Sequence, residues 1–93
     1  MNDTLVKSIE PVVTVLKRSG AKTVYVFGSA AKETMRDDSD IDLAVSGLPP
    51  EEFFKALSAV SSVSDRSIHL IDLDEVTPFT RYLKEEGELQ RVG

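Results

Sequence analysis

Two acidic residues at the start of an apolar run constrain the fold of this chain more than any other feature. Asp40 and Asp42 flank Ile41 and lead into the apolar residues 43–45. Side chains two positions apart in a strand point to the same face, so the two carboxylates should project together while Ile41 points into the core. Neighbouring carboxylates repel each other, and a divalent cation would offset that cost. The pattern predicts a strand over residues 40–45 that carries a metal site.

A glycine and a serine end an earlier apolar run, ten residues before the acidic pair. Residues 23–27 are β-branched and aromatic, which is typical of a buried strand, and Gly28 and Ser29 follow at once. The composition of residues 29–34 favours a short helix. Where a strand turns into a helix, backbone N–H groups bind phosphate oxygens. Gly28 and Ser29 are therefore predicted to hold phosphates. Lys32 either contacts a phosphate or a partner, or is a solvated surface lysine.

Apolar residues recur at helical spacing from the N-terminus to Gly20, which ends the pattern. A capping residue among positions 2–4 would begin this helix, but Pro11 is awkward inside it. Either the helix kinks at Pro11, or it begins near Ser8 with Pro11 in its first turn. The buried face of the helix is expected to comprise Leu5, Ile9, Val12, Val13 and Leu16.

Three further elements are predicted in the second half of the chain. They are a helix over residues 50–60, a strand over residues 66–73 and a last helix over residues 79–86, capped by Thr77 and followed by Gly87. The tail from residue 88 either frays or packs on a partner. The buried side of the middle helix should consist of Phe53, Phe54, Leu57 and Val60.

The alternation of helices and strands predicts an α/β (α+β) fold, with a small mixed sheet of three to four strands and helices packed mainly on one face. At 93 residues the chain is long enough for a single domain, residues 1–93, with one modest core.

Gly28-Ser29 followed after ten residues by Asp40-x-Asp42 closely resembles the nucleotidyltransferase superfamily that includes DNA polymerase beta. Over nearly its full length the chain is similar to the minimal nucleotidyltransferase (MNT) family. The resemblance implies the nucleotidyltransferase fold, with the acidic pair on the exposed face of the sheet. It also implies ATP as substrate and two Mg²⁺ ions held by Asp40 and Asp42, with Mn²⁺ as a substitute. In that reaction an acceptor oxygen attacks the α-phosphorus and pyrophosphate leaves.

One position departs from the family pattern. Family members carry a third carboxylate in a late strand that reads apolar-Asp-Leu-apolar, whereas residues 68–71 here read Ile-His-Leu-Ile. In a regular strand His69 would share a face with Ser67 and, by resemblance, would look onto the acidic pair. Asp72 would lie on the opposite face unless a bulge rotates it. His69 then either packs against a carboxylate, or acts catalytically by taking a proton or ligating the second metal.

Two functions from different classes follow from this resemblance. The first is transfer of AMP from ATP to a hydroxyl of a partner protein, with this chain as the antitoxin of a small helical HEPN-type toxin. The alternative to a complex with a HEPN-type protein is a homodimer of this chain. The second, which His69 favours, is a catalytically weak or inactive nucleotidyltransferase-fold module that neutralises its partner by contact.

The composition weighs against several other classes. A net charge of −5 argues against stable nucleic-acid binding, which needs a basic face. The absence of cysteine excludes disulfides and thiolate metal sites. No apolar run approaches the roughly 20 residues of a membrane span, and the N-terminus does not read as a signal peptide. We therefore expect a cytoplasmic protein with no membrane association.

Overall fold

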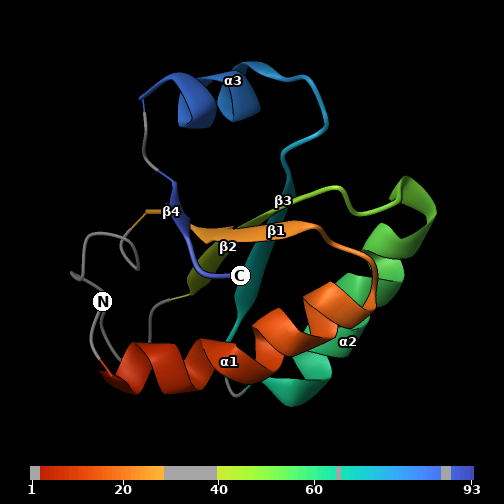
Figure 1. The fold of residues 1–93 in the computed structure, drawn as a ribbon, viewed down its shortest axis with the longest axis vertical. Helices are drawn as coiled ribbons and strands as arrows, with labels where there is room; N and C mark the ends of the chain where they lie inside the picture. The colour runs from red at the N-terminus through yellow and green to blue at the C-terminus, as the bar shows by residue number, and fades with distance from the viewer. Residues whose placement is uncertain (1–2, 29–39, 65, 87–88) are drawn as a thin grey trace.

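Four strands form one mixed sheet in this computed structural model, which describes residues 3–28, 40–64, 66–86 and 89–93 (Figure 1). The strands are β1 (Thr23–Val26), β2 (Ile41–Ser46), β3 (Ile68–Asp72) and β4 (Gln90–Arg91), in the order β3-β2-β1-β4. β3 runs parallel to β2, whereas the β1–β2 and β1–β4 pairs are antiparallel. The helices are α1 (Asp3–Arg18), α2 (Phe53–Val63), which follows the short 3-10 turn η1 (Pro50–Glu52), and α3 (Pro78–Glu86).

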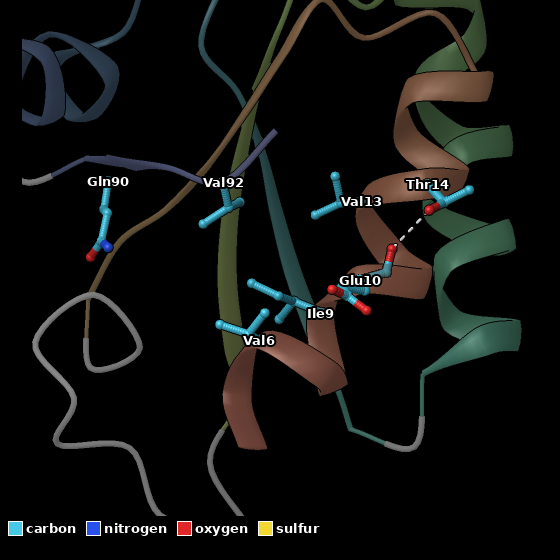
Figure 2. Close-up of a pocket in the computed structure, with 7 residues that line it drawn as sticks. All are labelled: Val6, Ile9, Glu10, Val13, Thr14, Gln90 and Val92. Carbon is cyan, nitrogen blue, oxygen red and sulfur yellow. Dashed lines mark hydrogen bonds between the residues drawn. The ribbon is translucent and has the colours of Figure 1, made fainter. Parts of the chain in front are cut away.

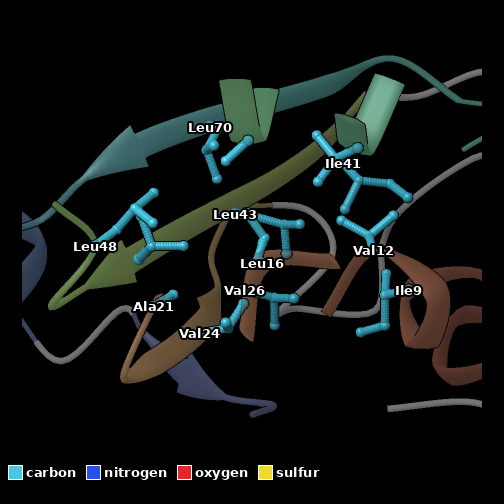
Figure 3. Packing of buried hydrophobic residues seen from close by; sticks show 13 residues of the cluster. Ile9, Val12, Leu16, Ala21, Val24, Val26, Ile41, Leu43, Leu48 and Leu70 are labelled. Atoms are coloured by element: carbon cyan, nitrogen blue, oxygen red, sulfur yellow. The ribbon is translucent and has the colours of Figure 1, made fainter. Parts of the chain in front are cut away.

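The main core lies between the sheet and the pair of helices α1 and α2 (Figures 1 and 3). Alternate residues of β1, β2 and β3 point toward these helices, as the period of two requires. Two of the three helices thus pack on one face of the sheet, and the predicted mixed α/β fold is confirmed. The largest fully buried side chains are Val12, Leu16, Val24, Val26, Ile41, Leu43, Val45 and Val60.

The first helix continues through its proline. α1 runs from Asp3 to Arg18 with Pro11 inside it, so the alternative start near Ser8 is wrong. A proline in a helix interior costs about 3 kcal/mol relative to alanine. Here Val12 and Leu16 are fully buried in the core and Pro11 is exposed, so burial of the apolar stripe offsets the lost backbone hydrogen bond. The side chain of Leu5 lies outside the described residues.

The buried side of α2 differs from the prediction at one aromatic residue. Phe54 is 78% exposed, and the positions that face the core are Ala56 and Val60, with Phe53 and Leu57 packed at the edge. The spacing 53, 56, 60 follows the helical period, which leaves Phe54 on the solvent side with its ring against that of Phe53 at 5.7 Å.

The C-terminal tail is part of the sheet, so the prediction that it frays is wrong for residues 90–93, and its packing on a partner stays a prediction. β4 pairs with β1, and Val24 exchanges backbone hydrogen bonds of 2.9 Å with Val92 and Gly93. The tail thereby satisfies N–H and C=O groups on the outer edge of β1 that would otherwise remain unpaired.

The last helix packs on the second face of the sheet. Leu83 of α3 is buried with Phe27, Ala44 and Leu73 in a small cluster separate from the main core. The predicted cap is confirmed, since Oγ1 of Thr77 accepts from the backbone N–H of Thr80 at 3.1 Å. None of the helices in the described part of the chain combines the length and apolarity that crossing a membrane requires.

Candidate active site

Strands β2 and β3 and the residue that follows β1 form a row of three residues across the second face of the sheet. Asp42 of β2 lies opposite His69 of β3, and the backbone N–H of Phe27 donates to the carbonyl oxygen of Asp42 at 3.1 Å. All three side chains point away from α1 and α2. Asp40 is exposed one position before β2 begins, and the alternation along the strand directs its side chain toward the same face as Asp42.

His69 is hydrogen-bonded to Asp42. Its Nδ1 lies 3.1 Å from Oδ1 of Asp42, with the imidazole 57% exposed and the carboxylate 25% exposed. An ionised carboxylate only accepts, so Nδ1 carries the donated hydrogen and, in the neutral ring, Nε2 keeps a free lone pair. The alternation of side chains put His69 on a face with Ser67, the family resemblance implied that this face looks onto Asp42, and the structure places His69 there.

Gly28 lies against the other oxygen of the same carboxylate. Its φ of +67° falls in the left-handed region, where glycine is favoured. A Cβ added at Gly28 would be 2.5 Å from Oδ2 of Asp42, closer than two such atoms can stand. The bare backbone of Gly28 and the imidazole of His69 thus hold the Asp42 carboxylate between them.

Replacing Gly28 by alanine should therefore both destabilise the fold and displace Asp42. We expect a loss of roughly 1–3 kcal/mol of unfolding free energy from backbone strain, and weaker binding of a Mg²⁺–triphosphate. Gly20→Ala is a matched control, since Gly20 also has a positive φ, of +117°, but its Cβ would meet Pro49. Chemical unfolding and calorimetry of both variants test this. Equal loss of triphosphate binding in the two variants would contradict a specific role for Gly28.

The other predicted site residues have different outcomes. Ser29 and Lys32 lie outside the described residues. Asp72 pairs with Val45 in an uninterrupted β2–β3 ladder, which puts it on the face opposite His69, so no bulge brings it into the site. Its Oδ1 instead accepts from the backbone N–H of Asp74 at 2.9 Å.

The donor set fits a metal shared with a substrate. No group of three or more His, Cys, Asp or Glu side chains among the described residues is arranged to hold a metal ion. Mg²⁺ is commonly bound by one or two carboxylates together with substrate phosphates and water. Asp40 and Asp42 offer hard oxygen ligands of this kind, beside the uncovered backbone of Gly28. The residues fit such a shared ion, and not a metal enclosed by protein ligands alone.

A separate groove lies on the other side of the sheet, beside α1. This groove of about 560 Å³ runs between α1 and β4, and Figure 2 shows its mostly apolar lining. Val6, Ile9, Val13 and Val92 contribute most of that lining, and Glu10 is the one carboxylate among the groove's lining residues. The groove contains none of the predicted site residues, so the row on the opposite face remains the candidate active site.

Sequence reasoning missed the aromatic border of this row. The ring of Phe27 lies 6.3 Å from His69 and 5.9 Å from Phe79 of α3. Strand alternation could have placed Phe27 on the Asp42 face, because it immediately follows β1. Phe79 could not have been found this way, since only the packing of α3 on the sheet brings it there.

The fold and the carboxylate at the edge of its exposed face define the nucleotidyltransferase class. The family model described as polymerase beta, nucleotidyltransferase matches residues 10–89, and the chain belongs to that family. A search of the curated proteins found no match.

Solved structures agree on the fold. A structure described as a minimal nucleotidyltransferase is 24% identical, with a TM-score of 0.72 over 98% of this chain and 93% of that one. A toxin–antitoxin structure with AMP-PNP is 20% identical, with a TM-score of 0.69 over 98% and 72%. A chain in the structure of a tri-AMPylated Shewanella oneidensis HEPN toxin with MNT antitoxin is 17% identical, with a TM-score of 0.66 over 94% and 70%. These likenesses establish a shared fold.

Proposed function

We propose that this chain is a Mg²⁺-dependent nucleotidyltransferase that transfers AMP from ATP to a hydroxyl of a partner protein. The observation that carries the proposal is the Asp42 carboxylate, held on the exposed face of the sheet between Gly28 and His69. Membership of the polymerase beta nucleotidyltransferase family supports the reaction class. The similar structures with AMP-PNP and with an AMPylated HEPN toxin support adenylate transfer and a HEPN-type partner.

Asp40 and Asp42 would hold the Mg²⁺, with Mn²⁺ as a substitute, and the backbone of Gly28 and Ser29 would hold the terminal phosphates. When bound, the metal supplies positive charge that offsets the charge of the triphosphate. Lys32 would add a contact to the phosphates. These residues would align the α-phosphorus with the attacking hydroxyl, and such alignment supplies much of the catalysis in phosphoryl transfer.

His69 would act on the proton of the acceptor. Its Nδ1 donates to Asp42, which leaves Nε2 as the basic atom. The acceptor oxygen forms a bond to the α-phosphorus, the bond from that phosphorus to the bridging oxygen of pyrophosphate breaks, and the hydroxyl proton passes to Nε2. Pyrophosphate leaves with the electron pair of the broken bond, so atoms and charge balance.

Residues 1–93 would act as one domain that depends on a partner for its acceptor. The described structure is a single sheet with its helices, and the main core joins all but the last of these helices. A small helical HEPN-type protein would bring the acceptor hydroxyl, and a homodimer is the alternative assembly.

The direct test combines the purified chain, labelled ATP, Mg²⁺ and a HEPN-type protein that forms a complex with it. We expect label on the partner protein, and none when Mg²⁺ is chelated. Mass spectrometry of the modified partner would identify the acceptor hydroxyl. Failure to label a partner that forms a verified complex, in Mg²⁺ and in Mn²⁺ alike, would contradict transfer.

A second function is favoured by one observation. His69 occupies the place of the third carboxylate and engages Oδ1 of Asp42 at 3.1 Å, which reduces the oxygen ligands available to a second metal. A chain with a weakened metal site could still neutralise its partner by contact. Under this alternative an Asp42→Asn variant would inhibit the partner as well as the wild type does, whereas the transfer mechanism requires loss of inhibition.

A further inference from the structure

The rings of His69, Phe27 and Phe79 lie in a row beside the candidate active site. We call these three residues the aromatic wall. The Phe27 ring lies 6.3 Å from the His69 ring, and 5.9 Å from the Phe79 ring at an interplanar angle of 66°. Phe27 is buried, whereas Phe79 is 44% exposed. The wall thus begins at the imidazole that bonds Asp42 and ends in a ring that solvent reaches.

Phe79 is presented by a helix end that is fixed in place. Oγ1 of Thr80 donates to the carbonyl oxygen of Glu75 at 2.6 Å and accepts from the backbone N–H of Thr77 at 3.0 Å. Leu83, one turn further along α3, is buried against Phe27. The hydrogen bonds of Thr80 to residues that precede Phe79, and the burial of Leu83 after it, hold this part of the helix. The ring of Phe79 is therefore pre-organised against Phe27.

We propose that the exposed part of Phe79, continued by the wall, is the surface on which the base of the nucleotide stacks. The inference rests on the proposed function, which places the α-phosphate beside Asp40 and Asp42. The base of a nucleoside triphosphate is joined to that phosphate through the ribose, so it must lie beside the acidic pair. Gly28 borders Asp42 with polar backbone suited to phosphates, whereas the wall borders it with rings suited to a base.

Stacking on an aromatic ring requires only a flat π face, so it tolerates any base. The structure therefore assigns affinity for the nucleoside part to Phe79, with purines favoured over pyrimidines because their rings have the larger area.

A partner protein is the competing occupant of the exposed ring of Phe79. The bond from the wall to Asp42, made by the imidazole of His69, favours the nucleotide, since other exposed apolar side chains, Val76 and Tyr82, are available to a partner.

The test compares ATP with inorganic tripolyphosphate, each titrated with Mg²⁺ into the isolated chain by calorimetry. Tripolyphosphate keeps the phosphates and lacks the base. In Phe79→Leu we expect ATP affinity to fall about tenfold, while tripolyphosphate affinity is unchanged. Phe79→Tyr keeps the ring and should keep ATP affinity. Tyr82→Leu is the matched control, because Tyr82 is an exposed aromatic of the same helix that lines a separate hollow with Pro78 and Arg81.

Each outcome decides the proposal once thermal unfolding shows that the variants fold. Selective loss of ATP affinity in Phe79→Leu supports it. Equal loss for both ligands would mean that the ring only shapes the site, and unchanged ATP affinity would overturn stacking while the phosphate site stands. Unchanged ATP affinity with weaker binding of the HEPN-type protein would assign the ring to the partner. A wild-type chain that binds neither ligand would overturn this proposal together with the proposed function.

Discussion

Replacing Asp40 and Asp42 together by asparagine is expected to lower Mg²⁺-dependent AMP transfer about a thousandfold, because metal-based charge stabilisation is worth several kcal/mol. Asparagine keeps the size of each side chain and removes its charge. The fold should survive, since Asp40 is exposed and Asp42 is partly exposed. Initial rates of label transfer, measured with wild type and variant at equal concentrations of the partner, give the effect.

Asp72→Asn is the matched control for this prediction. It makes the same chemical change on the opposite face of the same sheet, and the amide oxygen can still accept from the N–H of Asp74. Transfer by this control should equal that of the wild type. Calorimetry gives an independent check, because the double variant should lose the metal-dependent part of ATP binding. If Mg²⁺ left ATP affinity unchanged in wild type and double variant alike, Asp40 and Asp42 would not form a metal site.

His69→Asp is expected to raise Mg²⁺-dependent transfer about tenfold, because it adds a hard oxygen ligand for the metal and keeps a proton acceptor at this position. The new carboxylate would take the place of an imidazole whose Nδ1 lies 3.1 Å from Oδ1 of Asp42. Without metal the two carboxylates would repel each other, so the variant should unfold about 4 °C below the wild type and recover when Mg²⁺ is added. The preference for Mn²⁺ over Mg²⁺ should fall, since imidazole suits Mn²⁺ better than Mg²⁺.

His69→Asn separates the loss of the imidazole from the gain of a charge. It should show neither the recovery with Mg²⁺ nor the rise in transfer. Transfer rates of the three proteins in Mg²⁺ and in Mn²⁺ then distinguish the roles of the histidine. A wild type that is fast in Mg²⁺ and is slowed by His69→Asp would show that the imidazole serves the reaction better than a carboxylate at this position. A complete lack of transfer by all three, with a verified partner present, would favour the contact-only module.

Local sequence patterns predicted the centre of the site well. The period of two places Asp42 and Leu43 on opposite sides of the strand, with Leu43 in the core, and both positions are confirmed. The same period put His69 and Asp72 on opposite faces of one strand, the resemblance implied that His69 looks onto Asp42, and the parallel register confirms both. These predictions hold because the direction of a side chain in a strand depends only on its neighbours in the chain. The roles of these residues remain predictions.

Sequence patterns failed where the choice depended on packing. The apolar spacing in α2 was compatible with a buried Phe54, but the face of the helix that packs on the sheet is the one that carries Ala56 and Val60. Pro11 suggested a later start for α1, yet burial on both sides of the proline holds the helix through it. In both cases contacts with residues distant in the chain decided the outcome, and for Pro11 they overrode a local cost of about 3 kcal/mol.

By itself, the sequence determined the presence of strands β1, β2 and β3 and of helices α1, α2 and α3, which side of each of these strands is polar, and the family to which the chain belongs. Only the tertiary structure decided that the tail closes the edge of β1, that His69 bonds a carboxylate 27 positions away, and that α3 sets Phe79 against Phe27. The first set follows from periodicity and backbone preference, which act over a few residues. The second depends on strand register and on which apolar surfaces meet, and these are fixed only when the whole chain buries its core.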